Sequence, residues 1–249
     1  MEFKFKNFTK LFKNGKGIEN INIDVKSGEI LGLIGDNGSG KSTFIKSIFG
    51  EYTRQTGEII IDNKIIDKSD LGTFSLFPDQ SIYPQNISIF EFIKYTLKLS
   101  GANKKTIKKS VIEALENVNL IDYKNKTFKE LSAGMQKRAL LANALITNPI
   151  ILFLDEPTAN LDVKTRIQFL EILSDLAKVG IAIVITSHLI DELANLVDKL
   201  AILDNGKLTY CDYTNNDEES IKDLYIKYSE NITGSINVSK FVKNKFEND

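Results

Sequence analysis

The stretch "GDNGSGKST" at residues 35–43 decides the fold that we predict for this chain. Three glycines in it come just before a lysine, a serine and a threonine. Glycines let a loop turn several backbone N–H groups toward one point without Cβ clashes, and such a concave loop binds phosphate oxygens. An apolar segment precedes the stretch and a helical pattern follows it, which is the context that a phosphate-binding loop requires.

Three short apolar runs predict the sheet that carries this loop. They are "EILGLIG" (29–35), "PIILFLD" (149–155) and "GIAIVITS" (180–187). Each is rich in Ile, Leu or Val without polar alternation, which is typical of strands covered on both faces of a parallel sheet. Each run ends in polar residues and precedes a helical pattern, so the chain is predicted to be α/β, with ligands at the C-terminal edge of the sheet.

The rest of the chain divides by its patterning. Alternating residues in the first sixty predict a small N-terminal antiparallel β layer, and residues 88–123 show helical periodicity. No apolar strand run occurs between about 85 and 148. We therefore predict a P-loop NTPase (RecA-like) core over 1–84 and 146–212, with a mainly parallel sheet. An α-helical subdomain is inserted at about 85–145, the whole domain spans 1–228, and a polar C-terminal tail occupies 229–249.

Composition narrows the function classes. Lys and Arg number 32 against 33 Asp and Glu, so no basic excess favours nucleic acid, which is not an expected partner. The single cysteine, Cys211, excludes an internal disulfide and a cysteine-built metal site. The N-terminal residues lack the apolar core of a signal peptide, and the apolar runs are too short to span a bilayer. A membrane role is therefore expected to depend on a partner.

The phosphate-binding stretch supplies candidate ligands for ATP and Mg²⁺. Lys41 would reach the β- and γ-phosphates, and the Ser42 hydroxyl would ligate Mg²⁺. The N-terminus of the following helix adds partial positive charge. The nucleotide-binding residues predicted here are Gly35, Asn37, Gly38, Gly40, Lys41, Ser42 and Thr43.

Two other strand ends carry candidate catalytic groups. Asp155 and Glu156 follow the second apolar run, and adjacent buried carboxylates are costly without a cation. Asp155 would hold Mg²⁺, and Glu156 would orient or deprotonate the attacking water. His188, the only histidine, follows the third run and could donate to the γ-phosphate or to that water. The predicted catalytic residues are Glu156, His188 and Lys41.

Further motifs, in order along residues 3–228, give the chain a family resemblance. The segments "LSAGMQKR" (131–138), "IILFLDEPTANLD" (150–162) and "ITSH" (185–188) make it similar to the nucleotide-binding subunit of an ATP-binding cassette (ABC) transporter. The resemblance implies that Phe12 stacks on adenine. It also implies that two subunits pair head to tail, with Ser132 and Gly134 of each capping the ATP held by the other. Asp162 would line that interface.

Several positions depart from the family pattern or leave alternatives open. Ala133 stands where a glycine is usual, and Met135 resembles a variant found in many bacterial exporters. We predict Gln80 as a metal ligand and sensor, with its neighbour Asp79 as the alternative. Four apolar side chains either contact a membrane subunit or pack within the helical subdomain: Phe77, Ile82, Tyr83 and Ile87.

The resemblance implies an ATPase that hydrolyses ATP with Mg²⁺ in a head-to-tail dimer, either a homodimer or a heterodimer. It would power transport, in the manner of an exporter, by a separate integral-membrane permease. It would thus be cytoplasmic and peripheral on the inner face of the cell membrane. A soluble DNA-repair or ribosome-associated ATPase is the second hypothesis, disfavoured by the neutral charge. A catalytically weak regulatory subunit is the third, disfavoured by the presence of Lys41, Asp155, Glu156 and His188.

Overall fold

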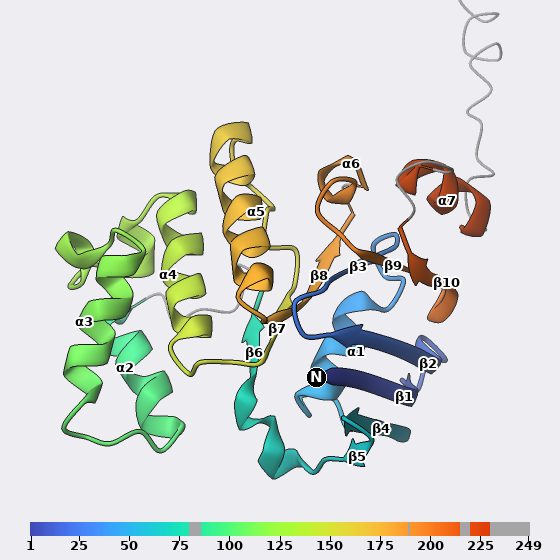
Figure 1. Cartoon of the computed structure of the whole chain (residues 1–249), viewed down its shortest axis with the longest axis horizontal. Helices are drawn as coiled ribbons and strands as arrows, with labels where there is room; N and C mark the ends of the chain where they lie inside the picture. Colours follow the sequence, from blue (N-terminus) through green and yellow to red (C-terminus); the bar gives the residue numbers. More distant parts are fainter. Residues whose placement is uncertain (80–85, 189, 215–219, 230–249) are drawn as a thin grey trace, which may run out of the picture.

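The computed structural model describes residues 1–79, 86–188, 190–214 and 220–229, which form two β-sheets and a set of helices (Figure 1). The strands are β1 Glu2–Leu11, β2 Gly17–Lys26, β3 Ile30–Ile34, β4 Thr56–Ile61, β5 Lys64–Ile65, β6 Phe74–Phe77, β7 Ile151–Leu154, β8 Ala182–Ser187, β9 Lys199–Asp204 and β10 Lys207–Tyr213. The α-helices are α1 Lys41–Ile48, α2 Ile89–Leu99, α3 Ile107–Asn117, α4 Ala133–Leu145, α5 Val163–Lys178, α6 Ile190–Leu193 and α7 Ile221–Tyr228. Short 3₁₀ turns are η1 Lys68–Thr73, η2 Ile121–Tyr123 and η3 Phe128–Glu130.

The larger sheet has six strands in the order β10-β9-β3-β8-β7-β6, and all neighbours are parallel except β10 and β9. The three strands predicted from apolar runs are β3, β7 and β8, and they lie side by side. Sequence analysis did not predict strands β6 and β9. Strand β6 has only four residues, and strand β9 begins and ends with charged residues, Lys199 and Asp204.

Side chains of the three central strands alternate between two hydrophobic cores. In β7, for example, Leu152 and Leu154 join one core, whereas Ile151 and Phe153 join the other. Strand neighbours point to opposite faces, so a run that is apolar at every position must be covered on both sides. This explains why the runs lacked polar alternation.

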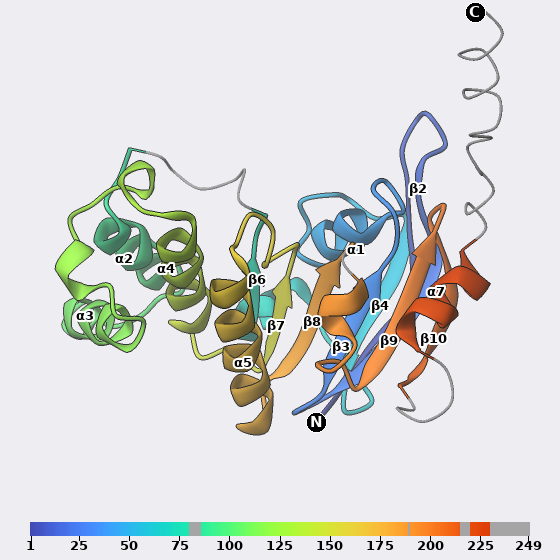
Figure 2. The same cartoon turned by 90° about the horizontal axis from the view of Figure 1, so that it is seen from above.

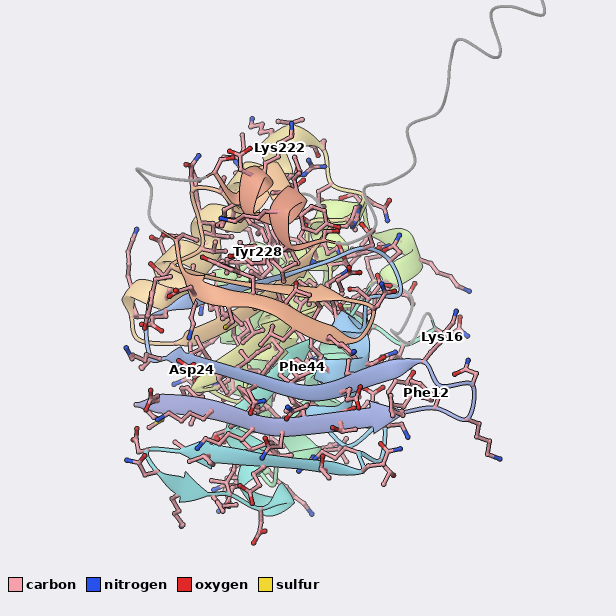
Figure 3. All side chains as sticks on the ribbon, turned by 90° about the vertical axis from the view of Figure 1, so that its right-hand side faces the viewer. Phe12, Lys16, Asp24, Phe44, Lys222 and Tyr228 are labelled. Atoms are coloured by element: carbon pink, nitrogen blue, oxygen red, sulfur yellow. The ribbon has the colours of Figure 1, made fainter. Side chains whose placement is uncertain are left out.

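The four-stranded sheet, in the order β2-β1-β4-β5, covers one face of the larger sheet with α1 packed between them (Figures 1 and 2). Its strands pair antiparallel, as predicted. Phe44 of α1 lies edge-on to Phe5 of β1, with ring centres 5.8 Å apart. Figure 3 shows this layer from its solvent side, with Phe44 behind the strands.

Helices α2 to α5 belong to the second core, on the other face of the larger sheet. Helices α2, α3 and α4 lie together at one end of the molecule (Figure 2). Helix α5 buries Phe169, Leu173 and Ala177 on one face and ends before Gly180, which has a φ of 97°. Within the described ranges, none of the helices combines the length and apolar character needed to cross a bilayer.

The structure overturns one of the proposed membrane-subunit contacts. Phe77 is fully buried at the end of β6, where its ring lies edge-on to Phe169 of α5, 5.6 Å between centres. The side chain faces the core because its strand has helices on that side, so it is not exposed for a partner. Ile87 is partly exposed, and Ile82 and Tyr83 lie outside the described residues.

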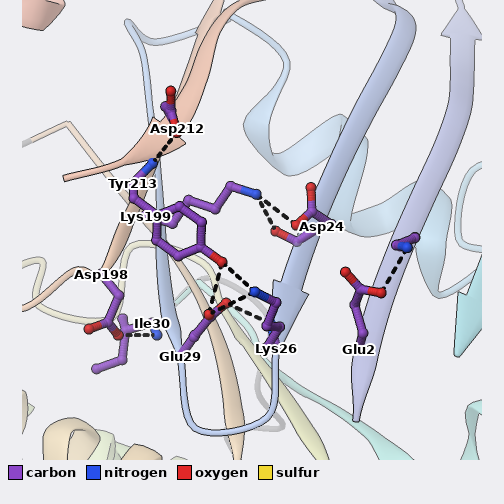
Figure 4. Close-up of polar contacts among 10 residues, drawn as sticks. Glu2, Asp24, Lys26, Glu29, Ile30, Asp198, Lys199, Asp212 and Tyr213 are labelled. Carbon is purple, nitrogen blue, oxygen red and sulfur yellow. Dashed lines mark hydrogen bonds and ion pairs between the residues drawn. The ribbon is translucent and has the colours of Figure 1, made fainter. Parts of the chain in front are cut away.

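A polar network joins the two sheets at the N-terminal end of β3 (Figure 4). Lys199 Nζ of β9 donates to Asp24 Oδ2 of β2 over 2.7 Å. Lys26 Nζ donates to the Tyr213 hydroxyl over 2.8 Å, and that hydroxyl donates to Glu29 Oε1 over 3.0 Å. The network fastens β2 to β9 and β10 at the end of the sheet opposite the glycine-rich loop.

Phe153→Ala should destabilise the fold because this ring lies where the two sheets and α1 meet. Phe153 is fully buried and contacts the rings of Phe5 and Phe49 at 5.7 and 5.5 Å between centres. Removal of a buried phenylalanine ring costs about 3–5 kcal/mol. Denaturant unfolding measures the loss, with Leu99→Ala as the control because Leu99 is 89% exposed. A loss no larger than that of the control would contradict this packing.

Candidate active site

The glycine-rich loop follows β3 and leads into α1. Gly40 is the N-cap of α1, with φ of 115°, and a Cβ there would lie 2.5 Å from Ile18 Cγ2. A Cβ on Gly35 would lie 2.2 Å from the main-chain oxygen of Leu203. Both positions therefore require glycine. Asn37 and Gly38 lie exposed at the tip of the loop.

Lys41 begins α1, and its side chain turns back into the loop. The residue is 6% exposed, and its Nζ donates to the carbonyl oxygens of Gly35 and Asp36 over 2.6 and 3.1 Å. Burial lowers the pKa of Lys41, and the carboxylates of Glu156, Asp155 and Asp36 oppose that shift. The ammonium group thus already bonds to oxygen atoms within the loop, and phosphate oxygens are acceptors of the same kind.

Asp155 follows β7 and lies beside the start of α1. It is 5% exposed, and its Oδ1 accepts hydrogen bonds from Ser42 Oγ over 3.2 Å and from Thr186 Oγ1 over 2.8 Å. Hydroxyl and carboxylate oxygens are the ligands that Mg²⁺ takes, so the donor set fits that ion. Ser42, Asp79 and Asp155 line a small cavity of about 100 Å³ there. Gln80 lies outside the described residues.

Glu156 lies between Asp155 and the end of β8. Its Oε2 is 2.8 Å from Nδ1 of His188, and its main-chain N–H donates to Thr186 Oγ1 over 2.9 Å. Its φ of 48° is unusual for a residue with a side chain. The three strand ends therefore do bring the loop, the carboxylate pair and the histidine together.

Two residues of this site were missed by sequence analysis. Thr186 is fully buried and forms hydrogen bonds with both Asp155 and Glu156. The feature of the sequence that could have indicated it is a hydroxyl-bearing residue near the end of an otherwise apolar strand. Lys137 of α4 is also fully buried. Its Nζ donates to the Glu156 carbonyl oxygen over 3.3 Å and lies 5.3 Å from the centre of the Phe77 ring. The feature of the sequence that could have indicated Lys137 is its position two residues before the largely apolar run "ALLANALI".

The segment 131–138 contains the start of α4. Ser132 is the N-cap, and its hydroxyl accepts a hydrogen bond from the main-chain N–H of Met135 over 3.3 Å. Ala133 is the first helical residue and has no positive φ, so its methyl group is accommodated without backbone strain. A Cβ on Gly134 would lie 3.0 Å from Thr165 Cγ2, so this glycine allows α4 to approach α5 closely.

Asp162 caps α5 and faces the same region. Its carboxylate accepts hydrogen bonds from the Thr165 N–H over 3.0 Å and from the Thr165 hydroxyl over 2.6 Å, and these bonds lower its pKa. Ser132, Gly134 and Asp162 line one hollow of about 780 Å³. The tip of the glycine-rich loop lines a different hollow of about 500 Å³. The two predicted phosphate-binding ends of this chain therefore line different hollows.

Phe12 lies in the hairpin between β1 and β2 (Figure 3). Its ring is edge-on to Tyr52, with centres 5.2 Å apart, and Lys10 Nζ lies 5.0 Å from the ring centre. It is 36% exposed, so part of the ring is accessible. Its contact with adenine stays a prediction.

Helix α7 touches the glycine-rich loop from the C-terminal side. The Tyr225 hydroxyl donates to Asp36 Oδ1 over 2.6 Å. Burial, the hydrogen bond and the nearby Asp36 charge raise the pKa of Tyr225 to about 12. The loop is thus braced by α7, which follows the β10 strand in sequence.

Comparison with known proteins shows the family of this chain. Residues 18–159 match the family model described as "ABC transporter". A putative ABC transporter ATP-binding protein of Mycoplasma pneumoniae is 34% identical over 209 residues, covering 82% of this chain and 64% of that protein. A glucose import ATP-binding protein of Saccharolobus solfataricus is 32% identical over 214 residues, covering 82% of this chain and 60% of that protein. A solved ATP-binding cassette, dimeric and bound to ADP and Pi after hydrolysis, is 27% identical with a TM-score of 0.74, covering 86% of this chain and 99% of that one.

The fold and the glycine-rich loop define a P-loop NTPase, with the mainly parallel sheet, antiparallel β layer and helical insertion that the sequence predicted. The family match covers more than half of the chain, so the chain belongs to the ABC transporter family. The chain spans 60 to 64% of the length of the two curated relatives above.

The buried charge of Lys137 should make stability depend on pH. Burial lowers the pKa of Lys137 from 10.5 to about 8, against the attraction of Asp79 and Glu156. Between those two values the unfolded chain binds more protons than the folded chain, so this contribution to stability rises with pH. Below pH 8 the buried charge costs about 3 kcal/mol, at about 1.4 kcal/mol for each pKa unit.

We therefore expect Lys137→Met to raise the free energy of unfolding at neutral pH, by an amount that shrinks as the pH approaches 10.5. Urea unfolding across this range measures the difference from wild type. Lys109→Met is the matched control, since the Lys109 side chain is 81% exposed. A gain that does not change across this range would show that burial leaves the pKa of Lys137 unshifted.

Proposed function

We propose that this chain is the ATP-binding subunit of an ABC transporter, which binds and hydrolyses ATP with Mg²⁺. The observation that carries the proposal is a continuous series of hydrogen bonds. It connects Ser42 to Asp155, Asp155 to Glu156 through Thr186, and Glu156 to His188. These contacts join the ends of three parallel strands at the glycine-rich loop, where a triphosphate would lie.

The loop would bind the phosphates through its backbone N–H groups and the ammonium of Lys41. The side chain of Lys41 would exchange the carbonyl oxygens of Gly35 and Asp36 for phosphate oxygens. Ser42 and Asp155 would hold Mg²⁺, with Gln80 or Asp79 as the further ligand. The ion, when bound, supplies positive charge that neutralises charge developing on the phosphate oxygens.

Glu156 is the proposed general base, and His188 the group that orients it. The Glu156 carboxylate would accept a proton from the attacking water, because it is the acidic group next to the one that holds the metal. His188 Nδ1, 2.8 Å from the Glu156 Oε2 atom, fixes the direction of that carboxylate. With Nδ1–H donating to the carboxylate, the other ring nitrogen would donate to the γ-phosphate or to the water only when the imidazole is protonated, and would accept from the water when it is neutral.

A second subunit would complete the site. The hollow that Ser132, Gly134 and Asp162 line is separate from the hollow at the tip of the loop, so the two ends do not share one hollow within this chain. Head-to-tail pairing would bring the α4 N-terminus of one subunit, a partial positive charge, to the nucleotide of the other. The relative bound to ADP and Pi is dimeric, which supports the pairing of two subunits. The partner would be either a second copy or a related chain.

Transport would be carried out by a separate membrane permease, which places this chain on the cytoplasmic face of the membrane. Export stays a prediction from Met135, whereas the Saccharolobus relative is an import ATP-binding protein. The permease, not this chain, would select the substrate. We also propose that the helical subdomain extends over about 85–145 of a domain spanning 1–228; the tail proposed after it lies almost wholly outside the described residues.

Glu156→Gln should separate nucleotide binding from turnover. The amide keeps the size of the side chain but cannot accept the proton, so ATP still binds and hydrolysis slows by about a hundredfold or more. Dimers should accumulate with ATP in size-exclusion chromatography, and a phosphate-release assay gives the rate. Lys41→Ala is the contrasting variant, for which we expect loss of ATP binding itself. Hydrolysis at the wild-type rate in Glu156→Gln would remove Glu156 from the role of base.

His188→Ala should lower turnover while leaving ATP affinity nearly unchanged. The substitution removes the group that orients Glu156, and a positioned polar group of this kind contributes about a hundredfold to the rate of the chemical step. Single-turnover hydrolysis and equilibrium binding of a fluorescent ATP analogue measure the two quantities. If both stay at wild-type values, the contact between His188 and Glu156 has no part in hydrolysis.

A further inference from the structure

Lys137 is a buried charge that the proposed mechanism does not use. It lies in the second turn of α4, and among the described residues it is the only charged side chain with 0% exposure. A buried ammonium without a paired carboxylate costs stability, whereas an apolar side chain of the same length would not. A charge kept at such a cost is often a functional group.

The contacts of Lys137 are with the two segments that flank the reaction centre. Its Nζ donates to the Glu156 carbonyl oxygen over 3.3 Å, and it lies 5.3 Å from the Phe77 ring centre at the end of β6. The main-chain N–H of Glu156 is held by Thr186. The Glu156 carbonyl oxygen also accepts a hydrogen bond from the Ala159 N–H over 3.3 Å, within the turn that follows β7. Both main-chain polar groups of Glu156 are therefore bonded, and Lys137 supplies the bond that comes from α4.

This double attachment bears on the direction of the Glu156 carboxylate. The residue has a φ of 48°, a conformation that residues with a Cβ adopt at a cost of about 1–3 kcal/mol when it is not supported by neighbours. Relaxation to an ordinary φ would swing the side chain away from His188. The hydrogen bond from Lys137 opposes that relaxation.

We propose that Lys137 is a positioning residue, which holds the backbone of Glu156 so that its carboxylate stays aimed at the attacking water. The proposal rests on the role proposed above for Glu156 as the base. Lys137 lies in α4, the helix that Ser132 caps and whose first turn contains Gly134. A movement of α4 would therefore be transmitted to Glu156 through the Lys137 side chain. Closure of a second subunit on the α4 N-terminus would thereby act directly on the catalytic carboxylate.

Lys137→Met tests the proposal, since methionine keeps a long unbranched side chain but has no N–H donor. We expect kcat for ATP hydrolysis to fall about tenfold, equivalent to about 1.4 kcal/mol. ATP affinity should stay within about twofold of wild type, and the melting temperature should not fall. Lys109→Met, in α3 of the same helical layer, is the control and should keep wild-type turnover.

A second background shows whether Lys137 acts through Glu156. In Glu156→Gln, adding Lys137→Met should leave the residual rate unchanged within about twofold, because the group that it positions is already disabled. An equal loss of rate in both backgrounds, or a wild-type kcat in the single variant, would overturn the role of Lys137 and leave the ATPase intact. A wild-type protein without ATPase activity would instead overturn the proposed function, and this role with it.

Discussion

The parallel pairing of β3, β8 and β7 is the constraint on which the site depends. In this register Ile34 lies opposite Ser187, and Leu154 lies opposite Ile185. Adjacent parallel strands end at one edge of a sheet, so the residues just beyond them meet although 113 positions separate Ser42 from Asp155 and 32 separate Glu156 from His188. A shift of one residue would turn each alternating side chain to the wrong core. The two packed cores therefore fix the register, and the register fixes the site.

Neutral hydroxyl groups hold the acidic residues in place. Thr186 donates to Asp155 and accepts from the Glu156 main chain, while Ser42 donates to Asp155. Hydroxyl groups satisfy the carboxylate oxygens without cancelling their charge. The site thus keeps a negative potential suited to a metal–triphosphate complex, whereas a permanent ion pair at Asp155 would compete with the cation.

Two features of the proposed site lower the stability of the fold. Lys137 is buried against Phe77, and Glu156 has a φ of 48°. Each feature costs free energy locally, and the aromatic and aliphatic cores on both faces of the sheet offset that cost. Both departures lie beside the strand ends, where the proposed chemistry occurs.

The sequence by itself determined the α/β class, the glycine-rich loop, the three central strands and the family, because local spacing carries each of these signals. Gly40 could be read as essential from the motif, and Ser132 as a helix cap from the residues after it. Only the tertiary structure decided that Phe77 is buried, and that Thr186 and Lys137 belong to the site. It also placed Asp79 in the cavity with Ser42 and Asp155. These facts depend on contacts between distant segments, and no periodicity within one segment records which neighbour a side chain will meet.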